Sequence, residues 1–229
     1  NIFTGFPFPG MQDENAGGAD LEHPIDLILQ EAFRGTTRDL RVSDERGRSK
    51  TLHVKIPAGV RDGSKVRRLT SAPGYDAEGS FSPDGKLIVF CSLRHAYPTN
   101  QLSEAERRQL ETDPSWFGEL YLMKADGSGV RRLTQSPGYD GGPFFTADGS
   151  RIVWRRFDEK GLIANVFTLR LDGSDLRQVT AFDSMSWAPF PHPSGAYFIF
   201  TSNKHGFENF ELFVVDVAGR VEHVQHPQR

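Results

Sequence analysis

The chain has 229 residues, a net charge of −3 and 37% hydrophobic residues, a composition typical of a globular fold with its own core. The charge offers no basic surface for nucleic acid, and no apolar run approaches the roughly 20 residues of a membrane span. The single Cys91 excludes an internal disulfide and a multi-cysteine zinc site, and its run LIVFCS places it in a core.

The N-terminal third predicts strands joined by turns. Residues 1–19 intersperse Phe3, Phe6 and Phe8 with glycine and proline. Alternating apolar residues then predict strands. These residues are Ile25, Leu27 and Leu29, then Leu40 and Val42, then Leu52, Val54 and Ile56. The stretches RGTT and PAGVRDG supply turns.

Two stretches, EAFRGTT from residue 31 and VKIPAGVRDGS from residue 54, carry a family resemblance. Residues 20–67 resemble the first C-terminal, client-binding domain of DnaJ-type co-chaperones, and residues 1–19 resemble the Gly/Phe linker of that family. The resemblance implies a β-sandwich with a client-binding groove. Its lining would be Leu27, Leu29, Leu40 and Val42. The alternative is that these residues are sandwich core.

This DnaJ-like segment departs from the family in three ways. The J-domain motif His-Pro-Asp is missing from the chain, so stimulation of Hsp70 is not expected. The zinc-knuckle cysteines are also missing. The strands that would continue the family's domain are replaced by a different sequence, so we interpret residues 20–68 as a truncated domain.

A repeat begins at residue 66, where VRRLT follows the DnaJ-like segment. Residues 66–92 align without gaps to residues 130–156 and match at 14 of 27 positions. Residues 176–202 form a third, more divergent copy. The offsets of 64 and 46 residues differ because an insertion at 93–119 lengthens the first copy. The two kinds of sequence therefore meet at Val66 and Arg67.

Each copy predicts four antiparallel strands. The turns SPDG, TADG and HPSG precede the apolar runs 87–90, 152–154 and 197–200. An alternating strand follows, and a last strand carries RRLT, RQVT or, at 221–224, VEHV. Four such strands in about 45 residues are typical of a β-propeller blade. We therefore expect an all-β chain with three blades over 69–224, an extra strand at 66–70 and a tail at 225–229.

The run VRRLT…PGYD…FSPDGKLIVF…ELYLMKADGSG resembles the repeat of TolB-type, WD40-like propellers. This resemblance implies a propeller, often six-bladed, with a face that binds a protein or peptide. The second and third copies also look like the propellers that accompany exported peptidases.

The insertion at 93–119 predicts a short surface helix. Ser103 is the expected N-cap, with Glu106 completing a capping box, and the helix should run to Thr112, ahead of Pro114. Trp116 and Phe117 are expected to anchor the insertion.

One face of the propeller is the candidate binding surface, here called the rim. In this fold, the loops that enter each innermost strand and the loops that join the two middle strands lie on the same face. The rim should gather aromatic and charged side chains suited to binding a protein or peptide. They are Tyr75, Asp76, Glu78, Tyr139, Asp140, Arg155, Arg156, Trp187, His205 and Asn209. The alternative is that the Tyr-Asp pairs are turn devices in which Asp caps backbone N–H groups.

The sequence contains no nucleophile elbow, HExxH pair, P-loop or dinucleotide fingerprint, so no catalytic residue, metal or cofactor is expected. The leading hypothesis is a non-catalytic module that binds a protein or peptide. Chaperone-like binding of unfolded proteins by the N-terminal segment is one alternative. An accessory propeller of a hydrolase whose catalytic domain is absent is another.

Three blades cannot close a ring, which leaves two partner hypotheses. Two copies would supply a six-bladed dimer, or the DnaJ-like strands would cover an open flank. The compartment stays open as well. The DnaJ-like part implies the cytoplasm, whereas the TolB-like part implies the periplasm or export.

Overall fold

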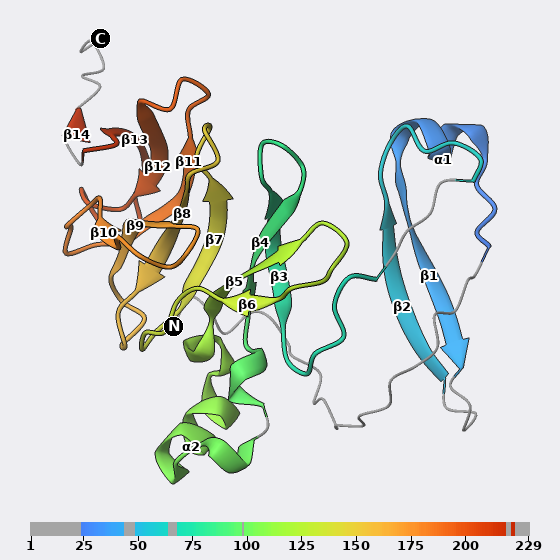
Figure 1. Cartoon of the computed structure of the whole chain (residues 1–229), viewed down its shortest axis with the longest axis horizontal. Helices are drawn as coiled ribbons and strands as arrows, with labels where there is room; N and C mark the ends of the chain where they lie inside the picture. Colours follow the sequence, from blue (N-terminus) through green and yellow to red (C-terminus); the bar gives the residue numbers. More distant parts are fainter. Residues whose placement is uncertain (1–23, 44–48, 64–67, 98, 219–220, 223–229) are drawn as a thin grey trace. The chain divides into compact units, whose positions relative to one another are not determined.

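The computed structural model describes residues 24–43, 49–63, 68–97, 99–218 and 221–222, and it falls into two units divided between Arg68 and Leu69 (Figure 1). The expected linker at 1–19 and tail at 225–229 lie outside the described residues, as does the overlap at Val66 and Arg67. Antiparallel strands dominate the described chain, so the all-β expectation is confirmed.

The first unit is a β-hairpin preceded by one short helix. Its elements are α1 (Leu29–Arg34), β1 (Thr36–Ser43) and β2 (Ser49–Ile56), and the two strands pair antiparallel. Gly35 joins α1 to β1 with φ +77°, and a Cβ at this position would lie 2.9 Å from the carbonyl oxygen of Ile56. Only glycine accommodates both the positive φ and this close approach.

The expected strand through Ile25, Leu27 and Leu29 is wrong. Residues 24–28 form no strand, and α1 begins at Leu29. A helix forms here instead of a strand because Leu, Gln, Glu and Ala are good helix formers. In addition, the Glu31 carboxylate accepts a 3.1 Å hydrogen bond from the backbone N–H of Ile28. The described residues of this unit form one two-stranded sheet and no second layer.

The second unit contains three four-stranded antiparallel sheets, each in chain order. The first sheet is β3 (Asp76–Phe81), β4 (Leu87–Ser92), β5 (Glu119–Lys124) and β6 (Arg131–Arg132). The second is β7 (Asp140–Phe145), β8 (Arg151–Phe157), β9 (Ala164–Arg170) and β10 (Arg177–Gln178). The third is β11 (Ser186–Pro191), β12 (Tyr197–Ser202), β13 (Glu211–Asp216) and β14 (Val221–Glu222).

The predicted turns between the first two strands of each sheet are confirmed. The Ser82 hydroxyl donates a 2.7 Å hydrogen bond to Asp84, and Gly85 takes φ +71°. In the second copy, the Thr146 hydroxyl donates to Asp148 at 2.6 Å. The Asp side chain closes the first two turns locally, and His192 Nδ1 and Ser194 Oγ, 2.8 Å apart, close the third, so the motif forms without help from the rest of the fold.

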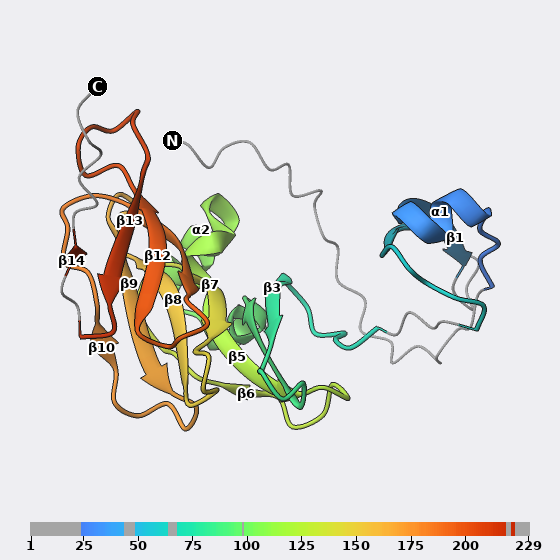
Figure 2. The ribbon, with the colours of Figure 1, turned by 90° about the horizontal axis from the view of Figure 1, so that it is seen from above.

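Large apolar side chains join the sheets face to face. Val89, Leu120 and Leu122 of the first sheet pack against the second sheet in a fully buried cluster. Their partners are Ile152, Trp154, Leu169 and Phe145. Val153 and Val166, on the other face of the second sheet, pack against Phe198, Phe200 and Phe213 of the third. Figure 2 shows this succession, from β13 through β8 to β3. Cys91 lies fully buried in the first sheet, as predicted.

The expected strand at 66–70 is not formed by its described residues 68–70. Leu69 instead packs against the outer face of the first sheet, on a cluster of four side chains that are each at most 6% exposed. They are Ile88, Phe90, Tyr121 and Met123. The Arg94 guanidinium adds to this cover, 5.1 Å from the ring centroid of Phe90.

The predicted helix in the insertion is confirmed as α2 (Glu104–Thr112). The Ser103 hydroxyl accepts from the backbone N–H of Glu106, and the Glu106 carboxylate accepts from the backbone N–H of Ser103 at 2.8 Å. Short 3₁₀ turns flank the helix at Arg94–Ala96, Thr99–Gln101 and Pro114–Phe117. Phe117 is buried with Leu110, and Trp116 packs beside them, so the predicted anchor is confirmed.

Candidate functional site at the rim

Backbone hydrogen bonds connect the loops of the rim at one end of the three sheets. They link the segments that lead into β7 and β11 to the long loops, or the strand ends beside them, of the same sheet and of the preceding sheet. The bonds run from Asp140 to Gly118 (2.8 Å), Phe157 to Tyr139 (2.9 Å), Ala164 to Ser184 (3.2 Å) and Asn203 to Met185 (3.2 Å), each from N–H to carbonyl oxygen. The loops 93–118, 158–163 and 203–210 therefore share one end, as the repeat predicts.

The first strand of each sheet (β3, β7 and β11) carries a bulge at the same position of the repeat. The pairing register shifts there, and the residues at the bulge have positive φ: Glu78 (54°), Gly142 (61°) and Ala188 (50°). Glycine occupies this conformation without strain, whereas glutamate and alanine do so at a cost of about 1 kcal/mol. Glu78 must therefore be held in place by its side-chain contacts.

The Glu78 carboxylate crosses from the first sheet to the second. It accepts hydrogen bonds from the Tyr139 hydroxyl at 2.6 Å, the Gly142 N–H at 2.7 Å and Arg155 Nη2 at 2.7 Å. Burial by itself would raise the pKa of Glu78. The Arg155 charge and these hydrogen bonds outweigh burial and hold this pKa below its usual value.

Arg155 extends the same network to the third sheet. The residue is 6% exposed, and its guanidinium lies 5.4 Å from the ring centroid of Tyr139 and 5.1 Å from that of Trp187. Burial raises the pKa of the Tyr139 hydroxyl, which therefore stays protonated and donates to Glu78. Four expected rim residues are thus brought together, but as an internal clamp between sheets.

The two aspartates of the Tyr-Asp pairs are each ion-paired with an arginine of their own copy of the repeat. Asp140 is fully buried and accepts from Arg156 Nε at 2.8 Å and Nη2 at 2.7 Å. Asp76 accepts from Arg94 at 2.8 Å. Neither caps a backbone N–H as the alternative reading proposed, and neither is a surface contact. Asp140 begins β7 directly opposite Arg156 of β8, whereas Asp76 begins β3 and reaches Arg94 in the 3₁₀ turn that follows β4.

A second buried network of polar side chains was not predicted from the sequence. The Glu119 carboxylate accepts from Arg132 at 2.8 Å, from the Ser136 N–H at 2.7 Å and from the Thr134 hydroxyl. In the next sheet, the Asn165 side chain takes the same role toward a threonine hydroxyl and a backbone N–H, both at 2.9 Å. The recurring threonine of RRLT and RQVT was the signal. Burial raises the pKa of Glu119, and the nearby Asp140 carboxylate raises it further.

Exposed aromatic and aliphatic side chains form the outer part of the rim. Phe207 is 59% exposed, Phe210 is 44% exposed, and Leu162 on the neighbouring loop is 60% exposed. Phe210 meets the half-buried Trp187 edge to face, with ring centroids 6.5 Å apart. Phe207, Phe210 and Leu162 were missed from the sequence, although aromatics in the polar loop NKHGFENFE were a usable signal.

The remaining expected rim residues separate into two places. His205 Nδ1 lies 2.7 Å from the Glu211 carboxylate, and Asn209 Nδ2 lies 3.5 Å from the same side chain, so both are at the exposed outer part. Tyr75 is half-buried against the insertion, beside the Leu93 and Phe117 cluster.

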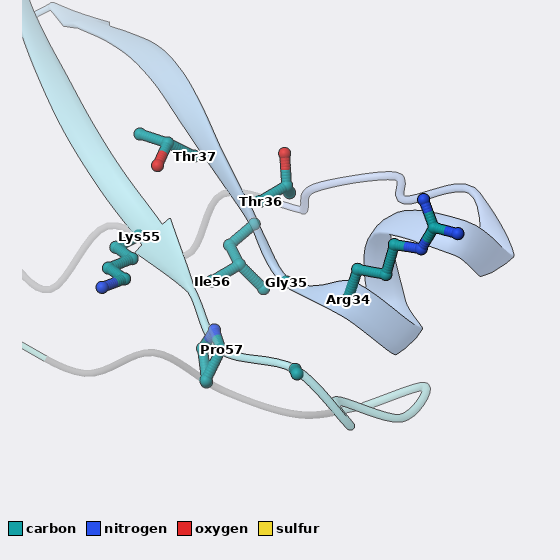
Figure 3. A pocket seen from close by; sticks show the side chains of 8 residues that line it. Arg34, Gly35, Thr36, Thr37, Lys55, Ile56 and Pro57 are labelled. Atoms are coloured by element: carbon teal, nitrogen blue, oxygen red, sulfur yellow. The ribbon is translucent and has the colours of Figure 1, made fainter.

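The expected client groove in the first unit is only partly assembled. Leu27 and Leu40 are half-buried, Leu29 is 86% exposed on α1, and the side chain of Val42 lies outside the described part. A hollow of about 280 Å³ opens nearby, with Arg34 on its helix side and Lys55 on its strand side (Figure 3). Its lining is Arg34, Gly35, Thr36, Thr37, Lys55, Ile56, Pro57 and Ala58.

Within the described ranges, no group of three or more His, Cys, Asp and Glu side chains is placed to hold a metal ion. In the same part of the chain, no helix has the length and apolar character needed to cross a membrane.

Comparison with known families shows which proteins share parts of this sequence. The DnaJ C terminal domain model matches residues 21–101, about a third of the chain. Chaperone protein DnaJ 2 of Thermus thermophilus is 35% identical over 86 residues, covering 38% of this chain and 27% of that protein. Protein Atu1656 of Agrobacterium fabrum is 28% identical over 122 residues, covering 53% of this chain and 34% of that protein. The chain thus spans between about a quarter and a third of the length of these curated relatives.

Solved structures add the fold of the second unit. A TolB-like chain from Agrobacterium tumefaciens superposes with a TM-score of 0.53 at 24% identity, over 80% of this chain and 59% of that one. A puromycin-hydrolyzing peptidase of Mycobacterium tuberculosis gives a TM-score of 0.51 at 16% identity, over 85% of this chain and 31% of that one. At these identities the likeness concerns the fold. The chain therefore resembles DnaJ-type C-terminal domains in one part and TolB-type propellers in the other.

Proposed function

We propose that the chain is a non-catalytic module whose propeller-like part binds a protein or peptide through the outer rim. In this proposal, the three sheets over residues 69–224 are propeller blades, and residues 20–68 are a truncated DnaJ-like client-binding segment. One observation carries the proposal: Leu162, Phe207 and Phe210 are large apolar side chains exposed on loops at the same end.

The loop that presents the two phenylalanines is held in shape before any partner arrives. Asn209 N–H donates to the carbonyl oxygen of Gly206, and Gly206 N–H donates to that of Asn203. The Asn203 side chain in turn accepts from the Met185 N–H at 2.8 Å. A preformed loop loses little conformational entropy on binding, so its exposed side chains are suited to recognising a partner.

An immobilised array of peptides with systematically varied sequence would test this proposal. The wild-type chain should bind a subset of peptides rich in apolar residues. Changing Phe207→Ala and Phe210→Ala together should lower that binding at least tenfold, because aromatic anchors dominate such interfaces. A Phe81→Ala variant is the matched control, since Phe81 is 62% exposed at the other end of an innermost strand. Equal loss in both variants, or no binding by the wild type, would contradict the proposal.

A second function has its own support in the first unit. Ile28, Leu29 and Phe33 are 62%, 86% and 78% exposed around α1, and such a patch suits an unfolded, apolar segment. Suppression of the heat-induced aggregation of a reporter enzyme would measure this activity. Leu29→Asp should abolish it, whereas Phe207→Asp should leave it intact. The alternative, an accessory propeller of a hydrolase, is supported only by the similarity of the fold to peptidases of known structure.

A further inference from the structure

The outer rim is formed by three segments at one end of the sheets. They are the loops 158–163 and 203–210 and the segment 181–185 that leads into β11. The Ala164 N–H donates to the carbonyl oxygen of Ser184 at 3.2 Å, which holds this segment beside the end of the first loop. Lys204 Nζ lies 4.1 Å from the ring centroid of Phe182, which brings the second loop to the same segment. The charges of the three segments therefore act on one surface.

Three carboxylates of the outer rim are exposed to solvent. They are Glu159 on the first loop, Asp183 on the segment before β11, and Glu208 on the second loop. Among the described residues, none of the three has a hydrogen bond or an ion pair. Each carboxylate is therefore available to a partner.

The cations at this end of the sheets do not balance these carboxylates. Arg155 and Arg156 are held in ion pairs with carboxylates of the sheets. Lys204 lies over the Phe182 ring, and Lys160 is the other lysine of the three segments. The outer rim as described thus has an excess of free negative charge around its exposed apolar side chains.

We propose that the partner of the outer rim is a peptide segment that combines apolar side chains with lysine or arginine. This inference rests on the proposed function and adds the chemical class of the partner. Glu208 lies between the exposed Phe207 and Phe210 in the chain, and Glu159 lies three residues before the exposed Leu162. Apolar side chains of the partner would contact these residues, and a cation beside them would meet a carboxylate.

The surface favours a cation in two ways. A free carboxylate attracts lysine and arginine and repels glutamate and aspartate. The exposed rings of Phe207 and Phe210 offer faces over which a cation is also stabilised. Exposed ion pairs contribute little each and are screened by salt, so the charge acts mainly by selecting the partner.

Fluorescence anisotropy with three labelled peptides tests the proposal on the full chain. The peptides share one core of leucine and phenylalanine and differ only at two flanking residues, which are lysine, serine or glutamate. The lysine peptide should bind about tenfold more tightly than the glutamate peptide at low salt, with the serine peptide between them. At about 0.5 M NaCl the difference should shrink to about twofold.

A double variant assigns the preference to the rim. Glu159→Gln with Glu208→Gln should bring the lysine and glutamate peptides to within about threefold of each other and leave binding of the serine peptide unchanged. Both side chains are exposed and unpaired among the described residues, so the fold should be unaffected.

Asp84→Asn with Asp172→Asn is the matched control. It removes the same charge from two turns at the opposite end of the sheets, where asparagine keeps the acceptor that closes each turn. This control should keep the full preference for the lysine peptide.

The other outcomes separate this inference from the proposed function. Equal binding of all three peptides, or tightest binding of the glutamate peptide, would overturn the cationic partner. The proposed function would still hold if Phe207→Ala with Phe210→Ala abolished that binding. A lysine preference that survives the double glutamine variant, or that the control removes equally, would overturn the inference as well. Binding of none of the peptides would overturn both.

Discussion

Glu78 in the first sheet accepts a 2.7 Å hydrogen bond from Arg155 in the second, although 77 residues separate them in the chain. The Arg155 side chain is 7% exposed and that of Glu78 is 28% exposed, so the ion pair is largely withdrawn from water. Glu78 also holds an unfavourable positive φ of 54°. The pair thus offsets local backbone strain by joining two sheets.

Replacing Glu78 should separate these two contributions. Glu78→Ala leaves the Arg155 charge buried without its carboxylate and should lower the free energy of unfolding by about 2–4 kcal/mol. Glu78→Gly makes the same loss but relieves the positive φ, so it should be about 1 kcal/mol more stable than Glu78→Ala. Urea unfolding of the two variants checks this. Equal stability of both would show that the backbone at this bulge is not strained.

The stability of the chain should depend on His95 in mildly acidic solution. Burial, together with the Arg132 charge, lowers the pKa of His95 from its ordinary value of 6.5 to about 4. Between about pH 6.5 and pH 4, His95 is therefore protonated in the unfolded chain but not in the folded chain. His95 thus makes unfolding progressively easier as the pH falls through that window, and it has no effect above it.

A His95→Phe variant tests this assignment, because the ring stays apolar beside Phe117. Its free energy of unfolding should fall less than that of the wild type between pH 7 and pH 4. Parallel pH profiles of the two proteins would count against a buried, neutral His95.

Cys91 should be inert in the folded chain. The side chain is fully buried, and burial raises the pKa of its thiol, so little thiolate is available to react. At pH 8 a disulfide reagent such as DTNB should release no chromophore from the native protein and one equivalent per chain in 6 M guanidinium. Rapid labelling of the native protein would show that the first sheet opens readily.

The insertion should depend on its helix cap. Ser103→Ala removes the hydroxyl that accepts from Glu106 N–H, and should cost about 1 kcal/mol of helix stability. Ser103→Asp keeps an acceptor and is the matched control. Hydrogen exchange of amides 104–112 measures the effect locally, and unchanged exchange in Ser103→Ala would contradict it.

The strands of the second unit and α2 could be predicted from the sequence because their determinants are local. Asp84 closes its turn onto Ser82, and Ser103 caps a helix three residues away, so each motif folds on nearby contacts. The failure at Leu29 is also local. Its apolar alternation suggested a strand, but helix propensity and the Glu31 cap outweighed a pattern of only three residues.

The site could be predicted as a set of rim residues but not as an arrangement. Arg155, Tyr139 and Trp187 were expected to face a partner, but together with Glu78 they join the three sheets instead. Their roles depend on distances across sheets, which the spacing along one chain does not contain. The exposed Phe207 and Phe210 were missed for the same reason, since a phenylalanine in a sequence looks the same whether covered or not.

The sequence by itself determined the repeat, the strand pattern and the two family resemblances, because alternation and turn chemistry act over a few residues. Only the tertiary structure decided what each repeated position does. Val89 and Ile199 occupy the same place in their copies, yet one is fully buried and the other is 40% exposed. In the described residues the second sheet packs on Val89 and no sheet packs on Ile199, so burial depends on the neighbour rather than on the residue.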